Sequence, residues 1–118
     1  MHGLPADADL SFLAGRTLTQ LGVGSNEAIL YFDVGQTWIR IEGRSSVEAA
    51  ASTTASDDSR EIAPAMFPLI GQSVTDVAWQ RSGTIRLTFD DGTTLVIEDD
   101  SPHYESYQIV HGNLQITV

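Results

Sequence analysis

An internal repeat constrains the fold of this chain more than any other feature of its sequence. Residues 13–21 recur as residues 69–77 with every apolar position kept, and residues 30–39 recur as residues 87–96. The separation between the copies is one residue larger for the second pair of segments, which one insertion in the intervening turn explains. A repeat on this scale indicates one supersecondary unit used twice. We therefore expect two halves with the same architecture.

Each copy carries the pattern of a β-hairpin. Apolar and polar residues alternate from Ile85 to Phe89, as they do in a strand with one buried face, and residues 91–92 then provide an Asp-Gly pair suited to a tight turn. Residues 28–36 carry the same pattern in the first copy, although residues 38–41 leave open which face of the next strand points inward. The sequence thus predicts paired strands in each half.

A short helical segment is expected upstream of each hairpin. The candidates are residues 7–13 and residues 59–69, and Gly15 and Gly71 stand about where a helix C-terminal cap is needed. The repeat unit is thus αβββ. A further hairpin, over residues 107–118, is expected in the second half only.

The fold class that follows is mainly β (α+β), with two pseudo-symmetric αβββ halves, at residues 13–42 and 69–118, forming an antiparallel β-sandwich or a partly open barrel. Residues 43–60 between them are small, polar and weakly patterned, so we expect a flexible linker, with a frayed alanine helix over residues 47–51 as the alternative. Three strands with one apolar face are marginally stable alone. Residues 1–118 are therefore expected to form a single domain.

The charge of the chain narrows the classes of partner. There are 16 acidic residues against six basic ones, which gives a formal net charge of -10 and an isoelectric point near 4.3. Such a field repels nucleic acid and anionic lipid and steers cationic partners toward the protein. We therefore expect no binding to nucleic acid or membrane. The acidity also has a simpler interpretation, which is solubility.

The sequence predicts a cytoplasmic location. It has no cysteine and therefore no disulfide, which suits a reducing compartment. The first nine residues have no basic flank followed by an apolar core, so no signal peptide is expected. No apolar run approaches the roughly 20 residues that a bilayer-spanning helix needs.

No arrangement of residues predicts catalysis, a cofactor or a metal. The histidines, His2, His103 and His111, lack the spacing of a metal site and are expected at the surface, with His111 in a turn. The polar cluster at residues 98–105 lacks the pattern of a calcium loop, and no nucleophile elbow frames its serine. Residues 22–24 lack the third glycine of a dinucleotide fingerprint. The chain is therefore not expected to be an enzyme.

Two motifs recur in both halves. Gly-x-[Ser/Thr]-[Leu/Val]-Thr begins at Gly15 and Gly71, Leu-x-Phe-Asp-x-Gly-x-Thr begins at Leu30 and Leu87, and Tyr-Glu-Ser-Tyr at residues 104–107 closes the second half. With these motifs the chain resembles a small bacterial family of uncharacterised duplicated β domains. The resemblance covers most of the two repeats and implies a fold rather than a reaction.

In size, acidity and lack of catalytic residues the chain also resembles the immunity proteins of bacterial contact-dependent growth inhibition and related polymorphic toxin systems. This resemblance implies that the partner is a cognate toxin domain, often a nuclease. An acidic protein can cover the basic cleft of such a domain. The function expected on this basis is that of an immunity protein, which binds the toxin and neutralises it.

The contact surface expected for the toxin is the acidic edge that follows residue 89. The partner-binding residues predicted there are Asp90, Asp91, Glu98, Asp99, Asp100, His103, Tyr104 and Glu105. Two other functions stay open. One is a homodimer or larger homo-oligomer that pairs exposed edge strands, with residues 114–118 as the candidate, and the other is a small-ligand-binding module with a cleft between the halves.

Overall fold

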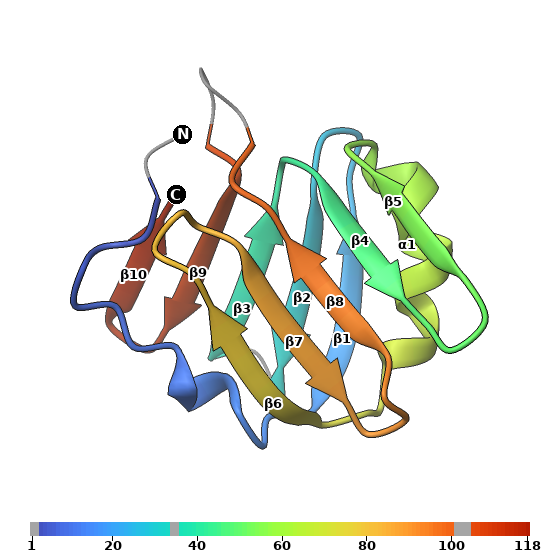
Figure 1. The fold of residues 1–118 in the computed structure, drawn as a ribbon, viewed down its shortest axis with the longest axis horizontal. Coiled ribbons are helices and arrows are strands. Elements are labelled where there is room, and N and C mark those ends of the chain that lie inside the picture. The colour runs from blue at the N-terminus through green and yellow to red at the C-terminus, as the bar shows by residue number, and fades with distance from the viewer. Residues whose placement is uncertain (1–2, 34–35, 101–104) are drawn as a thin grey trace.

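Two antiparallel β-sheets of five strands each face one another in the computed structural model, which describes residues 3–33, 36–100 and 105–118 (Figure 1). The expected mainly β fold is confirmed. Of the two expected alternatives the structure has the sandwich, because the strands form two separate sheets rather than one closed barrel.

Both sheets combine strands from early and late parts of the chain. The first sheet has the order β1-β2-β3-β9-β10 and consists of β1 (Leu18–Val23), β2 (Ala28–Phe32), β3 (Thr37–Ile41), β9 (Tyr107–His111) and β10 (Leu114–Thr117). The second sheet has the order β5-β4-β8-β7-β6 and consists of β5 (Thr53–Ser56), β4 (Ser45–Glu48), β8 (Thr94–Ile97), β7 (Ile85–Phe89) and β6 (Val74–Trp79).

Each half of the chain builds three strands of one sheet and contributes a hairpin to the other. In the first sheet, β9 and β10 of the second half lie beside β3 and extend the sheet of β1, β2 and β3. In the second sheet, β4 and β5 of the first half lie beside β8 and extend the sheet of β6, β7 and β8. The halves meet at Thr17 and Ser73, which form a bridge and whose hydroxyl oxygens lie 2.8 Å apart. The flanking backbone hydrogen bonds are reciprocal, which places a pseudo-twofold axis at this pair.

Two sequence predictions about the hairpins are wrong. The segment 43–60 is not a flexible linker, because β4 and β5 lie within it and β4 pairs with β8, with Val47 opposite Leu95. The hairpin β9–β10 is not an addition to the second half alone, because β4–β5 is its counterpart. Val47 is the only large apolar residue of 45–56, so the pairing with β8 rather than the local pattern determines these strands.

Of the two expected helical segments, the first is shorter than predicted and the second has the predicted extent. Residues 7–13 contain only the 3-10 helix η1 (Ser11–Leu13), because the segment runs along the sandwich and buries Leu10 and Leu13 completely. Residues 59–69 form the α-helix α1 (Ser59–Met66) and then the 3-10 helix η3 (Phe67–Leu69).

The helical segments cover two opposite open sides of the sandwich. Helix α1 contacts β4 and β5 of the second sheet and β1 of the first, whereas η1 contacts β6. The Asp58 carboxylate caps α1 by accepting the N–H of Arg60, and this bond holds the pKa of Asp58 below its usual value. None of the helices in the described part of the chain has the length and apolar composition needed to cross a membrane.

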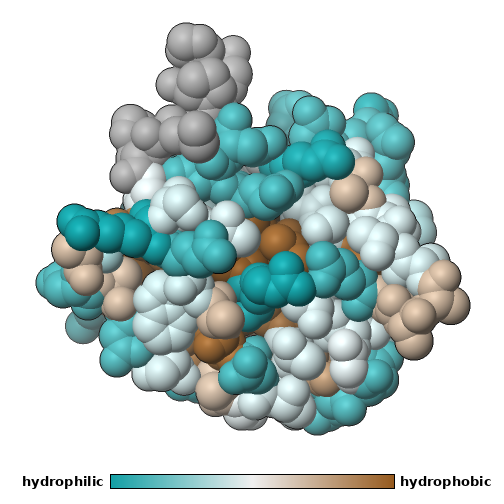
Figure 2. Space-filling model, in the orientation of Figure 1, coloured by the Kyte–Doolittle hydropathy of each residue, from teal (hydrophilic) through white to brown (hydrophobic). Residues whose placement is uncertain are grey.

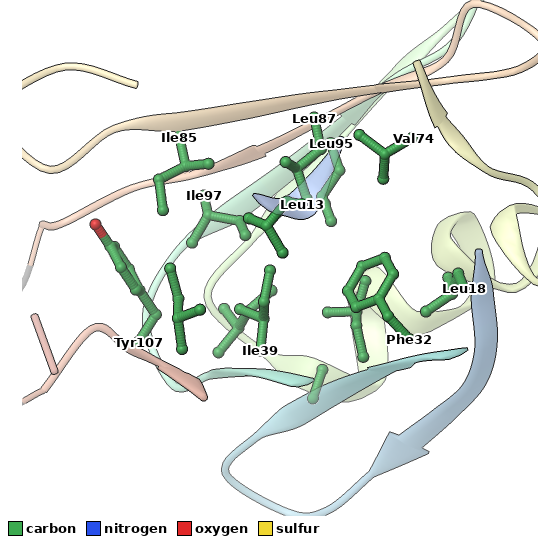
Figure 3. Close-up of a cluster of buried hydrophobic side chains, with 14 of the residues drawn as sticks. Leu13, Leu18, Phe32, Ile39, Val74, Ile85, Leu87, Leu95, Ile97 and Tyr107 are labelled. Atoms are coloured by element: carbon green, nitrogen blue, oxygen red, sulfur yellow. The ribbon is translucent and has the colours of Figure 1, made fainter. Parts of the chain in front are cut away.

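The core lies between the sheets, where side chains from both halves interleave (Figure 3). Phe32 of β2 and Phe89 of β7 occupy equivalent positions and are 0% and 1% exposed. Tyr107 of β9 is also buried, and its hydroxyl donates to the Gly83 carbonyl of the β6–β7 turn at 2.7 Å. Burial raises the pKa of this phenol far above its usual value, and the nearby Asp99 carboxylate raises it further.

Ser45 of β4 occupies the position that Tyr107 occupies in β9, and the structure predicts that its hydroxyl destabilises the fold. Ser45 is 1% exposed, and its hydroxyl has no hydrogen-bond partner among the described residues. We expect Ser45→Ala to raise the free energy of unfolding by about 1 kcal/mol, measured by urea denaturation. Ser46→Ala, on the outer face, is the control and should change it by less than about 0.5 kcal/mol. A loss of stability in Ser45→Ala would contradict the prediction.

Candidate functional site

The aspartates of the repeated Phe-Asp motif support the crossing of the two halves. The Asp33 carboxylate accepts the N–H of Thr17 at 3.0 Å, and the Asp90 carboxylate accepts the N–H of Ser73 at 2.7 Å. The same contact therefore occurs once in each half. A contact that recurs in this way follows from the fold, so it gives Asp90 a structural task.

Asp91 is also engaged in its own turn. Its carboxylate accepts the N–H of Thr93 at 2.9 Å and the side-chain amide of Gln72 at 3.1 Å. These hydrogen bonds, that of Thr93 above all, hold the pKa of Asp91 below its usual value. Asp90 and Asp91 both lie in the turn between β7 and β8. Asp90 and Asp91 therefore precede β8, and the other predicted residues follow it. The length of β8 separates the two groups.

The end of β8 and the start of β9, and with them the predicted residues Glu98, Asp99, Asp100 and Glu105, lie at the other end of the sandwich, at the top of Figure 1. Ser45, at the start of β4, pairs with Ser56 of β5 and Ile97 of β8, so these strand ends come together there. The β1–β2 turn and the β3–β4 connection lie at the same end. Eight of the 16 acidic residues gather at this acidic end: Glu27, Glu42, Asp57, Asp58, Glu98, Asp99, Asp100 and Glu105.

Asp99 is the exception among them, because its carboxylate is buried. It is 7% exposed, and its two oxygens accept the N–H of Gly3 at 2.7 Å and the hydroxyl of Ser106 at 3.1 Å. The carboxylate thus ties the N-terminal segment to the start of β9. Asp99 is therefore placed to hold the acidic end together rather than to meet a partner.

The three other described predicted residues at the acidic end reach solvent. Asp100 and Glu105 are exposed, and Glu98 is half-buried beside Arg44. His103 and Tyr104 lie outside the described residues. The strand order brings four further acids to the same end that the sequence pattern did not indicate, namely Glu27, Glu42, Asp57 and Asp58.

Five of the six arginines form ion pairs with acids of the same chain. The pairs are Arg16–Asp33 at 3.2 Å, Arg40–Glu27 at 2.6 Å, Arg44–Glu98 at 3.5 Å, Arg60–Asp58 at 3.4 Å and Arg86–Glu48 at 2.6 Å. The carboxylates around Arg40 raise its pKa above the usual value, mainly through the hydrogen bond from Arg40 to Glu27. Because these five arginines lie beside other acids, the exposed carboxylate of Asp100 keeps its negative field.

The acidic end is also where the two halves differ most in chain length. In the first half three residues, 42–44, connect β3 to β4, whereas in the second half nine residues, 98–106, connect β8 to β9. The flanking strands are equivalent, so the fold needs only the shorter connection. Apart from Asp99, the extra residues of 98–106 are therefore not accounted for by the strands that they connect, and loops of this kind commonly carry binding functions.

A family model described as a family of unknown function (DUF6188) matches residues 10–118. The chain belongs to this family. The match spans both halves, so it includes the crossing of the halves and the acidic end. Searches of curated proteins and of solved structures found no match.

Two shallow grooves of this DUF6188 chain are related by the pseudo-twofold axis. One, of about 370 Å³, lies between α1 and the β4–β5 hairpin and includes Glu61 in its lining, and the other, of about 350 Å³, lies between residues 5–9 and β10. Each groove lies between elements of different halves. A cleft between the halves is the place that the sequence suggested for a small ligand. Because the groove occurs in both halves, it follows from the packing of the fold.

The described residues contain no group of three or more His, Asp and Glu side chains that could hold a metal ion. His111 is the last residue of β9 rather than a turn residue, because β9 pairs with β3 as far as Thr37. Its ring stacks on Phe12, with 4.5 Å between ring centroids, and its Nδ1 lies 2.7 Å from the Thr37 hydroxyl oxygen. Thus His111 of the DUF6188 chain has a packing role away from the acidic end.

Proposed function

We propose that this protein is an immunity protein, which binds a basic bacterial toxin domain, a nuclease, through the acidic end and covers the cleft of that domain. The observation that carries the proposal is the nine-residue connection 98–106, where the other half has three residues. The exposed acids Asp100 and Glu105 belong to this connection. On this proposal the protein acts by occupying a surface and carries out no reaction.

The charge of the chain supports a basic partner. A nuclease presents a positive cleft because it binds phosphates, and a negative surface steers such a cleft toward itself and forms charge-assisted hydrogen bonds with it. The chain has a formal charge of -10, and most of its arginines are already paired internally. The field that a partner meets at the acidic end is therefore negative.

The double variant Asp100→Asn/Glu105→Gln tests the proposal. Tagged protein is used to capture its partner from the native organism, and the captured protein is then produced alone. We expect it to be basic, to stop growth when expressed, and to be neutralised by the immunity protein. The double variant should bind it about 10-fold more weakly, chiefly through slower association, with a smaller effect at high salt.

The matched control is Asp7→Asn/Asp76→Asn, which removes the same charge from exposed residues elsewhere on the fold. This control should bind with nearly the affinity of the unmodified chain. If both double variants weaken binding equally, net charge rather than the acidic end determines the interaction. If the captured protein is harmless to cells, the immunity role is excluded.

A homo-oligomer is the second candidate, and one observation favours it. Strand β10 lies at an edge of the first sheet, and its Leu114 is 43% exposed. An uncovered edge strand can pair with the edge of another copy. Sedimentation of the purified chain as a dimer that Leu114→Lys dissociates would support this candidate, whereas a monomer at high concentration would exclude it.

A further inference from the structure

The outer face of the first sheet carries aromatic side chains that the acidic end does not include. Tyr31 of β2 pairs with Trp38 of β3, and Trp38 pairs in turn with Val110 of β9. All three are half-buried, whereas the residues before and after Tyr31 and Trp38 and the residue before Val110 are buried. We call Tyr31, Trp38, Val110 and the adjacent Ile29 of β2 the aromatic face.

The second sheet provides an internal comparison for this face. By strand pairing, its strands carry Thr88, Thr94 and Glu48 at the positions equivalent to Tyr31, Trp38 and Val110. The turn before β8 is one residue shorter than the turn before β3, so the structure matches Trp38 with Thr94 and not with Leu95, its counterpart in the sequence repeat. Figure 2 looks onto that sheet and shows hydrophilic or neutral residues around a hydrophobic area in the middle of the face. The same strand geometry therefore forms with threonines. The strand geometry thus does not by itself require the aromatic rings of the first sheet.

Acidic side chains surround one edge of the aromatic face. Arg40 lies two residues along β3 from Trp38, on the same face, and its guanidinium is 2.6 Å from Glu27 and 3.3 Å from Glu42. Glu105 is close enough to raise the pKa of Arg40 as well. One guanidinium thus stands among three carboxylates. The rim of the aromatic face carries a net negative charge and joins the acidic end.

We infer that the aromatic face and its acidic rim form the docking surface for an arginine- or lysine-bearing surface of the partner protein. Guanidinium and ammonium groups are attracted to the faces of Trp and Tyr rings and to carboxylates. Trp and Tyr also dominate the binding energy of many interfaces. A second copy of this chain is disfavoured, because it would bring two negative rims together. The inference rests on the proposed function and adds the place where the basic partner is anchored.

Photocrosslinking in native cells tests where the partner lies. Full-length chains carry p-benzoylphenylalanine at position 31 or 38, and matched chains carry it at the equivalent positions 88 or 94 of the other sheet. We expect adducts with one basic protein from positions 31 and 38 and none from 88 and 94. No adduct from 31 and 38, an adduct with a second copy, or equal yields from all four positions would overturn the inference.

The partner identified by crosslinking is then purified alone, and its affinity for variants of this chain measures the contribution of the aromatic face. Trp38→Thr introduces the residue that the equivalent strand position already accommodates, and it should weaken binding at least about 10-fold. Tyr31→Thr should also weaken it, whereas Thr94→Ala should have no effect. A thermal melt checks that each variant is folded, and Trp38→Phe serves in place of Trp38→Thr if that variant does not fold.

The two sets of variants separate the inference from the proposed function. If Asp100→Asn/Glu105→Gln weakens binding and folded Trp38→Thr does not, the acidic end stands and the aromatic face is excluded. If neither variant weakens binding, both are excluded. If Trp38→Thr weakens binding of a protein that proves harmless to cells, the docking surface stands and the immunity role is excluded.

Discussion

Phe32→Ala is expected to lower the free energy of unfolding by about 3–5 kcal/mol, and Phe89→Ala by a similar amount. The two rings are 0% and 1% exposed and occupy equivalent positions in β2 and β7. Each truncation leaves a cavity between the sheets. The strands on both sides prevent this cavity from collapsing fully. Because domains of this size are stable by about 5–15 kcal/mol, either variant should be partly unfolded under mild denaturing conditions.

Urea denaturation monitored by circular dichroism measures this loss, and the linear slope tests whether unfolding stays two-state. Phe67→Ala is the control, because Phe67 of η3 is 52% exposed, and it should lower stability by less than about 1 kcal/mol. A difference of more than about 2 kcal/mol between Phe32→Ala and Phe89→Ala would show that the two sides of the core are not equivalent.

Gly83→Ala is expected to lower the free energy of unfolding by about 3 kcal/mol or more. Gly83 has φ +112°, which strains any other residue, and an added Cβ would lie 2.6 Å from the Asp99 Cβ. Backbone strain contributes about 1–3 kcal/mol and overpacking about as much. The clash also displaces a buried carboxylate that holds Gly3 and Ser106. Loss of these contacts should loosen the acidic end.

Gly92→Ala separates the two contributions to this loss. Gly92 has φ +88° in the β7–β8 turn, but an added Cβ would meet nothing within 4 Å. Gly92→Ala should therefore lower the free energy of unfolding through backbone strain alone, by about 1–2 kcal/mol. Thermal and urea unfolding of both variants give the comparison. Equal losses in Gly83→Ala and Gly92→Ala would mean that Asp99 does not approach Gly83 as closely as the structure has it.

The sequence predicted the strands that carry strong alternation and missed those that do not. Residues 85–89 place Ile85, Leu87 and Phe89 on one face, as expected. Residues 38–41 left the inward face open, and the structure resolves it because Ile39 and Ile41 are buried while Trp38 and Arg40 are half-buried. Residues 45–56 are Ser, Thr and Ala for the most part, so their strands depend on the pairing of β4 with β8 and on contacts with α1.

The candidate site was predicted only where it is local in the chain. Asp100 and Glu105 belong to one connection, so the sequence placed them together. The sequence could not place Glu27 and Glu42 beside them, because that depends on the order of strands. The burial of Asp99 could not be predicted either, because one of its hydrogen-bond partners, Gly3, is 96 residues away in the sequence. Trp38 and Tyr31 became a surface only once the register paired them.

The exchange of hairpins between the sheets determines when this protein can fold as it is synthesised. Strand β3 lies in the middle of the first sheet, but its neighbour β9 begins at Tyr107. Until the ribosome has made and released residues 107–117, the backbone groups on one edge of β3 have no partner and can pair wrongly. We therefore expect the first sheet to be completed only after residues 107–117 have left the ribosome.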